Sequence, residues 1–111
     1  MISISEILKP TGIDVSRIKY SGDAKTYITY FYYNERGEKF ADDIEIATNY
    51  SLQVDVWSEE DCIELAEQVK NLIINAGFKR TFATEMYENE TQIFHKVLRF
   101  SYVQNNEIQE E

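Results

Sequence analysis

The sequence predicts a single α+β domain, in which a mostly antiparallel sheet of four to five strands carries one long helix packed on a face, with a short N-terminal helix. Three observations predict it: alternation of apolar and polar residues over 43–57, apolar residues at helical spacing over 62–76, and two strand-like segments joined by a tight turn afterwards. A length of 111 residues leaves room for one core. We expect residues 1–103 to form the domain and residues 104–111 to be a frayed acidic tail.

The N-terminal part predicts a short helix and two extended segments. The helix covers residues 3–9 and stops at Pro10. Residues 15–20 are extended, and residues 27–33 indicate a strand because aromatic and β-branched residues dominate them. Both faces of this strand carry large side chains, so we expect both to be covered.

The middle of the chain predicts a polar connection and then the clearest strand. The connection covers residues 34–43 and begins with a turn. The strand places on one face the largely apolar set Ile44, Ile46, Thr48, Tyr50, Leu52, Val54 and Val56, and polar side chains such as Asp43 and Asp55 lie between them. One face should therefore be buried and the other solvated.

The last third predicts the long helix and a hairpin. Ser58 should cap a helix over residues 59–76, because acidic side chains fill its first turn and suit the positive end of the helix dipole. Gly77 should end it as a C-terminal cap. Residues 78–88 and 92–103 indicate two strands joined by a tight turn.

Composition argues against several classes of partner. Eleven basic and twenty acidic residues give a formal net charge of −9, and the cations are spread along the chain. Such a chain is repelled by phosphate, so specific nucleic-acid binding and adhesion to anionic membranes are disfavoured. We expect no signal peptide, and no stretch approaches the roughly 18 apolar residues of a membrane span. The single Cys62 suits a reducing compartment.

Residues able to do chemistry are few, and we expect neither an enzyme nor a cofactor. The only histidine, His95, lies in a predicted strand, and Cys62 lies on the apolar stripe of the predicted helix. One cysteine and one histidine cannot form a zinc cluster of the usual spacing. Asp42, Asp43 and Glu45 form an acidic cluster whose spacing matches no known cation loop, so we expect a solvated face there and no metal site.

Two features favour binding over catalysis. Four of the seven residues in 27–33 are tyrosines, which are enriched at protein interfaces, although a strand buried on both faces explains them equally well. The polar connection over 34–43 is too long for a minimal hairpin turn, and such loops often carry contacts. The sequence therefore favours a binding protein.

Several local phrases resemble a known family. Residues 50–58 (Tyr-Ser-Leu-Gln-Val-Asp-Val-Trp-Ser) precede the helix, which contains residues 64–69 (Glu-Leu-Ala-Glu-Gln-Val), and the hairpin closes on residues 95–100 (His-Lys-Val-Leu-Arg-Phe). Residues 26–30 (Thr-Tyr-Ile-Thr-Tyr) are similar to the family's aromatic strand, without the proline often found there. Over residues 25–103 the chain resembles the tail-completion proteins (head–tail joining proteins or tail terminators) of siphophages and related prophages.

The resemblance implies a ring, usually of six copies, at the end of the tail tube. Such a ring ends tube growth and joins the tail to the head, so the implied partners are further copies, the major tail protein and the head-connector proteins. DNA passes through the lumen of such a ring, and an acidic lumen would repel it. The implied location is the neck of the virion, after assembly in the bacterial cytoplasm.

The resemblance also indicates where contacts form. Subunits of such rings generally meet through sheet edges and long loops, which here predicts the connection and the hairpin tip: Asn34, Glu35, Arg36, Glu38, Lys39, Phe40, Asp42, Asp43, Glu88, Asn89 and Glu90.

Two other classes stay open. One is a dimeric bacterial regulatory module that binds a small molecule near a sheet edge. The other is an enzyme that uses Asp43 and Asp55 with magnesium. These two lie twelve positions apart, roughly 40 Å along one strand, which argues against a shared site.

Overall fold

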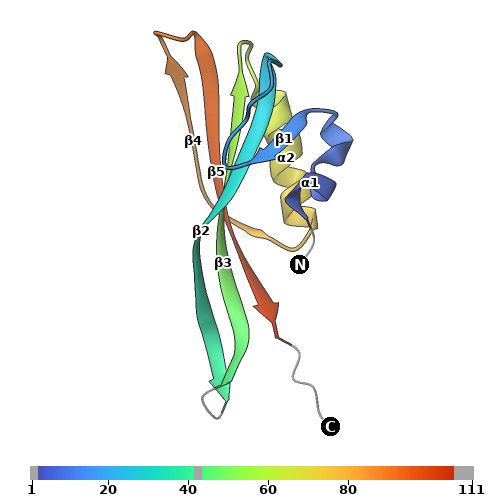
Figure 1. Cartoon of the computed structure of the whole chain (residues 1–111), viewed down its shortest axis with the longest axis vertical. Coiled ribbons are helices and arrows are strands. Elements are labelled where there is room, and N and C mark those ends of the chain that lie inside the picture. The colour runs from blue at the N-terminus through green and yellow to red at the C-terminus, as the bar shows by residue number, and fades with distance from the viewer. Residues whose placement is uncertain (1–2, 42–43, 107–111) are drawn as a thin grey trace.

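The computed structural model describes residues 3–41 and 44–106, and it shows one twisted sheet with its helices on one side (Figure 1). The strands lie in the order β1-β2-β3-β5-β4; β1 pairs with β2 in parallel, and every other pair is antiparallel. The elements along the chain are α1 (Ile4–Ile7), the 3-10 turn η1 (Lys9–Thr11), β1 (Asp14–Arg17), β2 (Thr26–Ala41), β3 (Ile44–Ser58), α2 (Ile63–Asn75), β4 (Lys79–Glu88) and β5 (Ile93–Asn105).

The predicted fold class, α+β with one long helix, is wrong. Strands make up 57% of the described residues and helices only 20%, and α2 has 13 residues. The helix is shorter because Ser58 remains in β3, where its hydroxyl lies 2.8 Å from that of Thr26. The helix begins at Ile63 instead, whose backbone N–H donates to the Asp61 carboxylate at 3.1 Å. The acidic run therefore forms a bend between strand and helix.

The predicted polar connection over residues 34–43 is also wrong, because β2 continues through it to Ala41. Its outer residues pair with β3 from Asn34↔Ser51 to Ala41↔Ile44, with register shifts at three places. Pairing with an adjacent strand overrides the weak strand preference of these polar residues. Asp42 and Asp43 lie outside the described residues.

The outer half of the β2–β3 hairpin, residues 34–41 and 44–50, is called the arm here. It runs away from both helices and gives the molecule extents of 55 × 24 × 23 Å (Figure 1). The strand β5 pairs with β3 as far as Ala47↔Asn105, two residues beyond the predicted end of the domain. Past that point the arm has only two strands. The remainder of the predicted tail, residues 107–111, lies outside the described residues.

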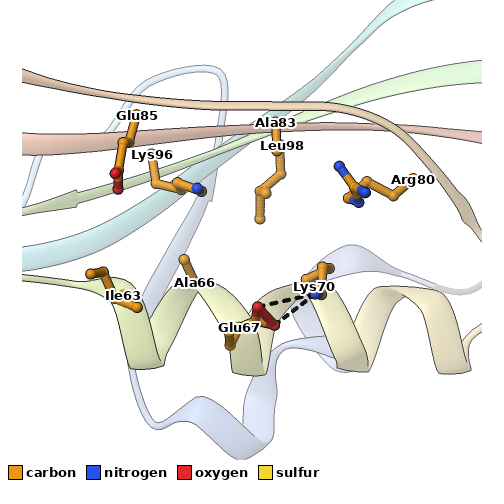
Figure 2. Close-up of a pocket in the computed structure, with 9 residues that line it drawn as sticks. All are labelled: Ile63, Ala66, Glu67, Lys70, Arg80, Ala83, Glu85, Lys96 and Leu98. Atoms are coloured by element: carbon orange, nitrogen blue, oxygen red, sulfur yellow. Dashed lines mark hydrogen bonds and ion pairs between the residues drawn. The ribbon is translucent and has the colours of Figure 1, made fainter.

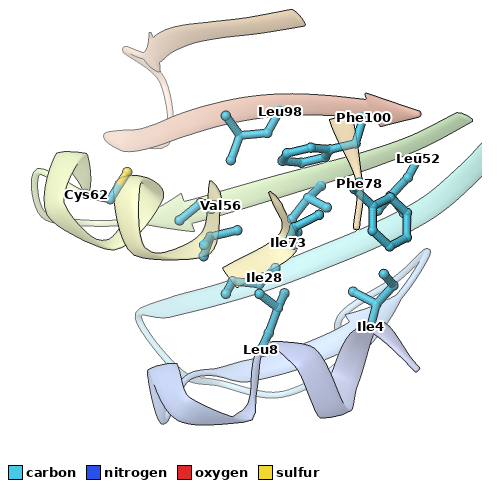
Figure 3. Packing of buried hydrophobic residues seen from close by; sticks show 12 residues of the cluster. Ile4, Leu8, Ile28, Leu52, Val56, Cys62, Ile73, Phe78, Leu98 and Phe100 are labelled. Atoms are coloured by element: carbon cyan, nitrogen blue, oxygen red, sulfur yellow. The ribbon is translucent and has the colours of Figure 1, made fainter. Parts of the chain in front are cut away.

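The core lies between the helices and one face of the sheet (Figure 3). Ile4 and Ile73 from the two helices pack with Leu52, Val56 and Phe100 from the central strands, and all five are at most 2% exposed. Every second residue of β3 faces this core, which confirms the apolar face predicted for its inner half. The outer end differs: Ile44 is 59% exposed because it lies at the tip of the arm.

The opposite face of the sheet carries no helix among the described residues, so the prediction that both faces of residues 27–33 are covered is wrong. Residues on this face alternate with the core residues along each strand. We call it the helix-free face. The strand pairings place on it Tyr27, Thr29, Phe31, Tyr33, Gln53, Asp55, Trp57, Phe82, Thr84, Met86, His95, Val97, Arg99 and Val103.

The hairpin that follows α2 is confirmed, and Gly77 ends the helix as predicted. Gly77 has φ of 105°, which L side chains rarely adopt, and a Cβ there would lie 3.3 Å from Cε2 of Tyr102. We expect Gly77→Ala to lower the free energy of unfolding by about 1–3 kcal/mol in urea denaturation. The control is Gly12→Ala, at φ of 70° with open space around the new methyl group. Equal losses in the two variants would contradict the steric part of this argument.

Candidate functional site

The helix-free face has a buried polar centre formed by Asp55 on β3 and His95 on β5. Nε2 of His95 lies 2.7 Å from Oδ1 of Asp55, and their side chains are only 11% and 6% exposed. Gln53 also donates its amide to both oxygens of this carboxylate at 3.1 Å. Nδ1 of His95 is buried and has no hydrogen-bond partner within the described part of the chain. The prediction that this face of β3 is solvated is therefore wrong at Asp55, whose side chain is buried.

Aromatic rings cover this polar centre and continue across the sheet. The rings of Trp57 and His95 stack at 3.6 Å between centroids, and Trp57 donates its indole N–H to the Thr29 hydroxyl at 3.0 Å. Beyond Trp57 lies Tyr27, and Tyr20 stacks on Tyr27 at 4.2 Å. This row of rings crosses β5, β3 and β2.

Arg99 is a cationic side chain of the helix-free face that lies against two aromatic rings. Its guanidinium lies 5.3 Å from the ring centroid of Tyr33 and 5.2 Å from that of Phe82, and its Nε donates to Gln53 at 3.0 Å. Both rings are close to half exposed. Aromatic and arginine side chains are enriched at the centre of protein interfaces.

On the helix side, a groove runs between α2 and the β4–β5 hairpin (Figure 2). Its volume is about 310 Å³, and small side chains such as Ala66 and Ala83 leave the space open. An adjoining hollow of about 330 Å³ shares Ile63, Glu85 and Lys96 with it. The groove is defined by Ile63, Ala66, Glu67, Lys70, Arg80, Ala83, Glu85, Lys96 and Leu98.

The groove gathers three cations of this acidic chain. Lys70 pairs with Glu67 at 2.7 Å, and its hydrogen bond and charge hold the pKa of Glu67 below the usual range. Lys96 and Arg80 lower this pKa as well, and both line the groove together with Glu67 and Lys70. Neither Lys96 nor Arg80 has an ion-pair partner within 4 Å in residues 3–41 and 44–106.

Cys62 lines the adjoining hollow, at the start of α2. Burial raises the pKa of its thiol, and the nearby Asp61 carboxylate raises it further. A raised pKa leaves little thiolate at neutral pH, so this thiol is a poor nucleophile. The structure thus favours a small core residue at this position.

The predicted contact residues lie in two places. Asn34, Glu35, Arg36, Glu38, Lys39 and Phe40 belong to the arm, and Glu88, Asn89 and Glu90 lie at the β4–β5 turn. The arm tip and this turn are at opposite ends of the long axis (Figure 1). The structure does not bring the two sets together within one chain. Asp42 and Asp43 lie outside the described residues.

The described part of the chain holds no cluster of metal-binding side chains. No three side chains of the metal-binding types lie together among those residues. The Asp55–His95 pair has the arrangement of a carboxylate that orients a base, and the Thr29 hydroxyl accepts a hydrogen bond from the Trp57 indole. Sequence reasoning missed this pair because its members lie 40 positions apart, and only the strand pairing joins them.

Comparisons with known proteins do not assign this chain to a family. No protein-family model and no curated protein matches this sequence. No helix in the described residues is long and apolar enough to cross a membrane.

Proposed function

We propose that this chain is a non-enzymatic assembly protein of a phage or prophage tail. It would form a ring, in the resembled family usually of six copies, at the head–tail junction, where it ends tube growth and joins tail to head. Its partners would be further copies, the major tail protein and the head-connector proteins. The observation that carries the proposal is the arm.

The arm exposes apolar surface that its own chain does not cover. Phe40 and Ile44 near its tip are 63% and 59% exposed. Beyond the Ala47↔Asn105 pair the arm is a two-stranded ribbon. Such a ribbon is marginally stable in water on its own, and exposed strand edges invite pairing with another chain. An arm of this kind gains its stability from a partner, which suits an assembly protein better than an enzyme.

The positions of the two predicted contact regions also support a ring. Closed rings form when one patch on a subunit meets a different patch on the next. Here the arm tip and the β4–β5 turn near Glu88 lie at opposite ends of a molecule 55 Å long (Figure 1). In a head-to-tail contact, the arm tip of one copy would meet a patch near the β4–β5 turn of the next copy.

The test is a tagged pull-down from the native host after prophage induction, with bound proteins identified by mass spectrometry. We expect major tail and head-connector proteins to be recovered, and electron microscopy to place the tag at the tail end. Recovery of the bait alone, or of metabolic enzymes, would contradict the proposal. That outcome would favour the dimeric regulatory module, and a rise in melting temperature with a small metabolite would then identify its ligand.

A further inference from the structure

We propose that the groove between α2 and the β4–β5 hairpin receives the arm tip of a second copy of this chain. Phe40 of one copy would enter the groove of the next, and carboxylates beside it would meet Arg80 and Lys96. This inference rests on the proposed ring and names the contact that holds it together.

The chemistry of the groove defines what it can accept. Glu67 already neutralises Lys70 at 2.7 Å, which leaves Arg80 and Lys96 against the single carboxylate of Glu85. The rest of the wall is apolar, with Ile63, Ala66, Ala83 and Leu98. An occupant that fits both parts carries a carboxylate next to an apolar side chain.

The arm tip presents that combination. A Cβ added to Gly37 would lie 2.4 Å from Cζ of Phe40 and 2.7 Å from Oε1 of Glu45, so the ring and the carboxylate lie together over this glycine. Both Phe40 and Glu45 are exposed, as is Glu38. The tip therefore offers an aromatic side chain beside the Glu45 carboxylate, with Glu38 two residues before it and the exposed Lys39 next to it in sequence.

Geometry requires that the arm come from another copy. The arm continues the line of β2 and β3 away from α2, and its tip is at the far end of the long axis from the β4–β5 turn (Figure 1). It cannot fold back onto its own groove without breaking the pairing that forms it. A contact between two different patches repeats from copy to copy and can close a ring.

The first test joins the two surfaces by a disulfide. In a Cys62→Ala background, Ala41→Cys supplies a thiol at the arm tip and Ile63→Cys supplies one in the groove. The doubly substituted chain is expressed in the host during prophage induction, and the lysate is oxidised. We expect a ladder of linked copies from dimers upward, because each chain carries one thiol of each kind.

The matched control moves the groove thiol to the helix-free face. Val103→Cys replaces Ile63→Cys, at 49% exposure compared with 58%. We expect its ladder to be at least ~10-fold weaker, because disulfides need Cα atoms within about 7 Å. Equal ladders in the two chains would overturn the inference.

The second test reverses the charges. We expect Arg80→Glu with Lys96→Glu to lower the yield of linked copies at least ~10-fold, and Glu38→Lys with Glu45→Lys to do the same. Combining the four changes should restore the yield to within about threefold. These side chains are exposed or half-buried, and the melting temperature of each variant checks that it folds. Failure of the combined variant to restore linkage would overturn the inference.

The outcomes separate this inference from the proposed function. Tails that carry the chain without an Ala41→Cys to Ile63→Cys link would overturn the inference and leave the proposed function standing. Linked copies that are absent from tails would overturn the proposed function and leave the inference about the groove standing. A link from Ile63→Cys to a tail-tube protein, identified by mass spectrometry, would assign the groove to that partner and overturn the inference.

Discussion

Replacing residues 38–47 by Asn-Gly should abolish tail joining while leaving the body folded. Asn-Gly closes a two-residue hairpin turn next to the Gly37↔Thr48 pair, so the inner parts of β2 and β3 keep their register. The change removes Phe40 and Ile44, the two exposed apolar side chains of the tip. Central aromatic and apolar anchors of an interface contribute about 2 kcal/mol or more each. We expect recovery of the major tail protein to fall at least ~30-fold in the induced-host pull-down.

The matched control is Ile74→Ser, which removes an exposed apolar side chain from α2, outside both predicted contact regions. Its tail recovery should stay within about twofold of the unchanged chain. Circular dichroism should show the same sheet content in the unchanged chain and in Ile74→Ser, and in the arm-shortened chain a decrease that matches the strand residues removed. An arm-shortened chain that still joins tails at full yield would contradict the role given to the arm.

Asp55→Ala should lower the free energy of unfolding by about 2–4 kcal/mol. The change removes the 2.7 Å contact to His95 and leaves a buried imidazole with neither nitrogen bonded to protein. Urea denaturation can be followed by the fluorescence of Trp57, the only tryptophan, whose ring stacks on that imidazole. Asp14→Ala is the control: its exposed carboxylate accepts from Tyr20, and its loss should cost under about 1 kcal/mol.

A double-mutant cycle separates the pair from general packing. His95→Phe keeps an aromatic ring against Trp57 and removes the partner of Asp55. In that background Asp55→Ala should cost at least about 1 kcal/mol less than it does alone. Losses that add within about 0.5 kcal/mol would show that the two side chains are not coupled.

The sequence predicted the local pattern well where one face of a strand or helix is buried. The buried face along the inner half of β3 and the position of Gly77 after α2 were both predicted correctly. Burial and backbone conformation depend here on residues only a few positions apart in the sequence. The prediction that Ser58 caps the helix was wrong because its hydroxyl hydrogen-bonds with that of Thr26 on β2, which lies 32 positions earlier in the sequence. The arm was missed for a related reason, since polar residues form strands when a partner strand supplies the hydrogen bonds.

The candidate surfaces were predicted less completely than the fold. The predicted contact residues mark the arm and the β4–β5 turn, yet the groove beside Arg80 and Lys96 has no signature in the sequence. It exists because a helix from one part of the chain and a hairpin from another enclose small side chains. Arg99 and its two aromatic neighbours were missed likewise, since Tyr33, Phe82 and Arg99 meet only through strand pairing.

The long strand β3 has a mechanical consequence. It runs without interruption from the arm tip to Ser58, and β2 and β5 flank it along most of this length. A pull on the tip along the strand direction loads the hydrogen bonds of both neighbours in shear, so many must slide together before any separates. A pull across the strand would peel them one at a time. A tether built this way resists tension along its axis and yields to sideways force.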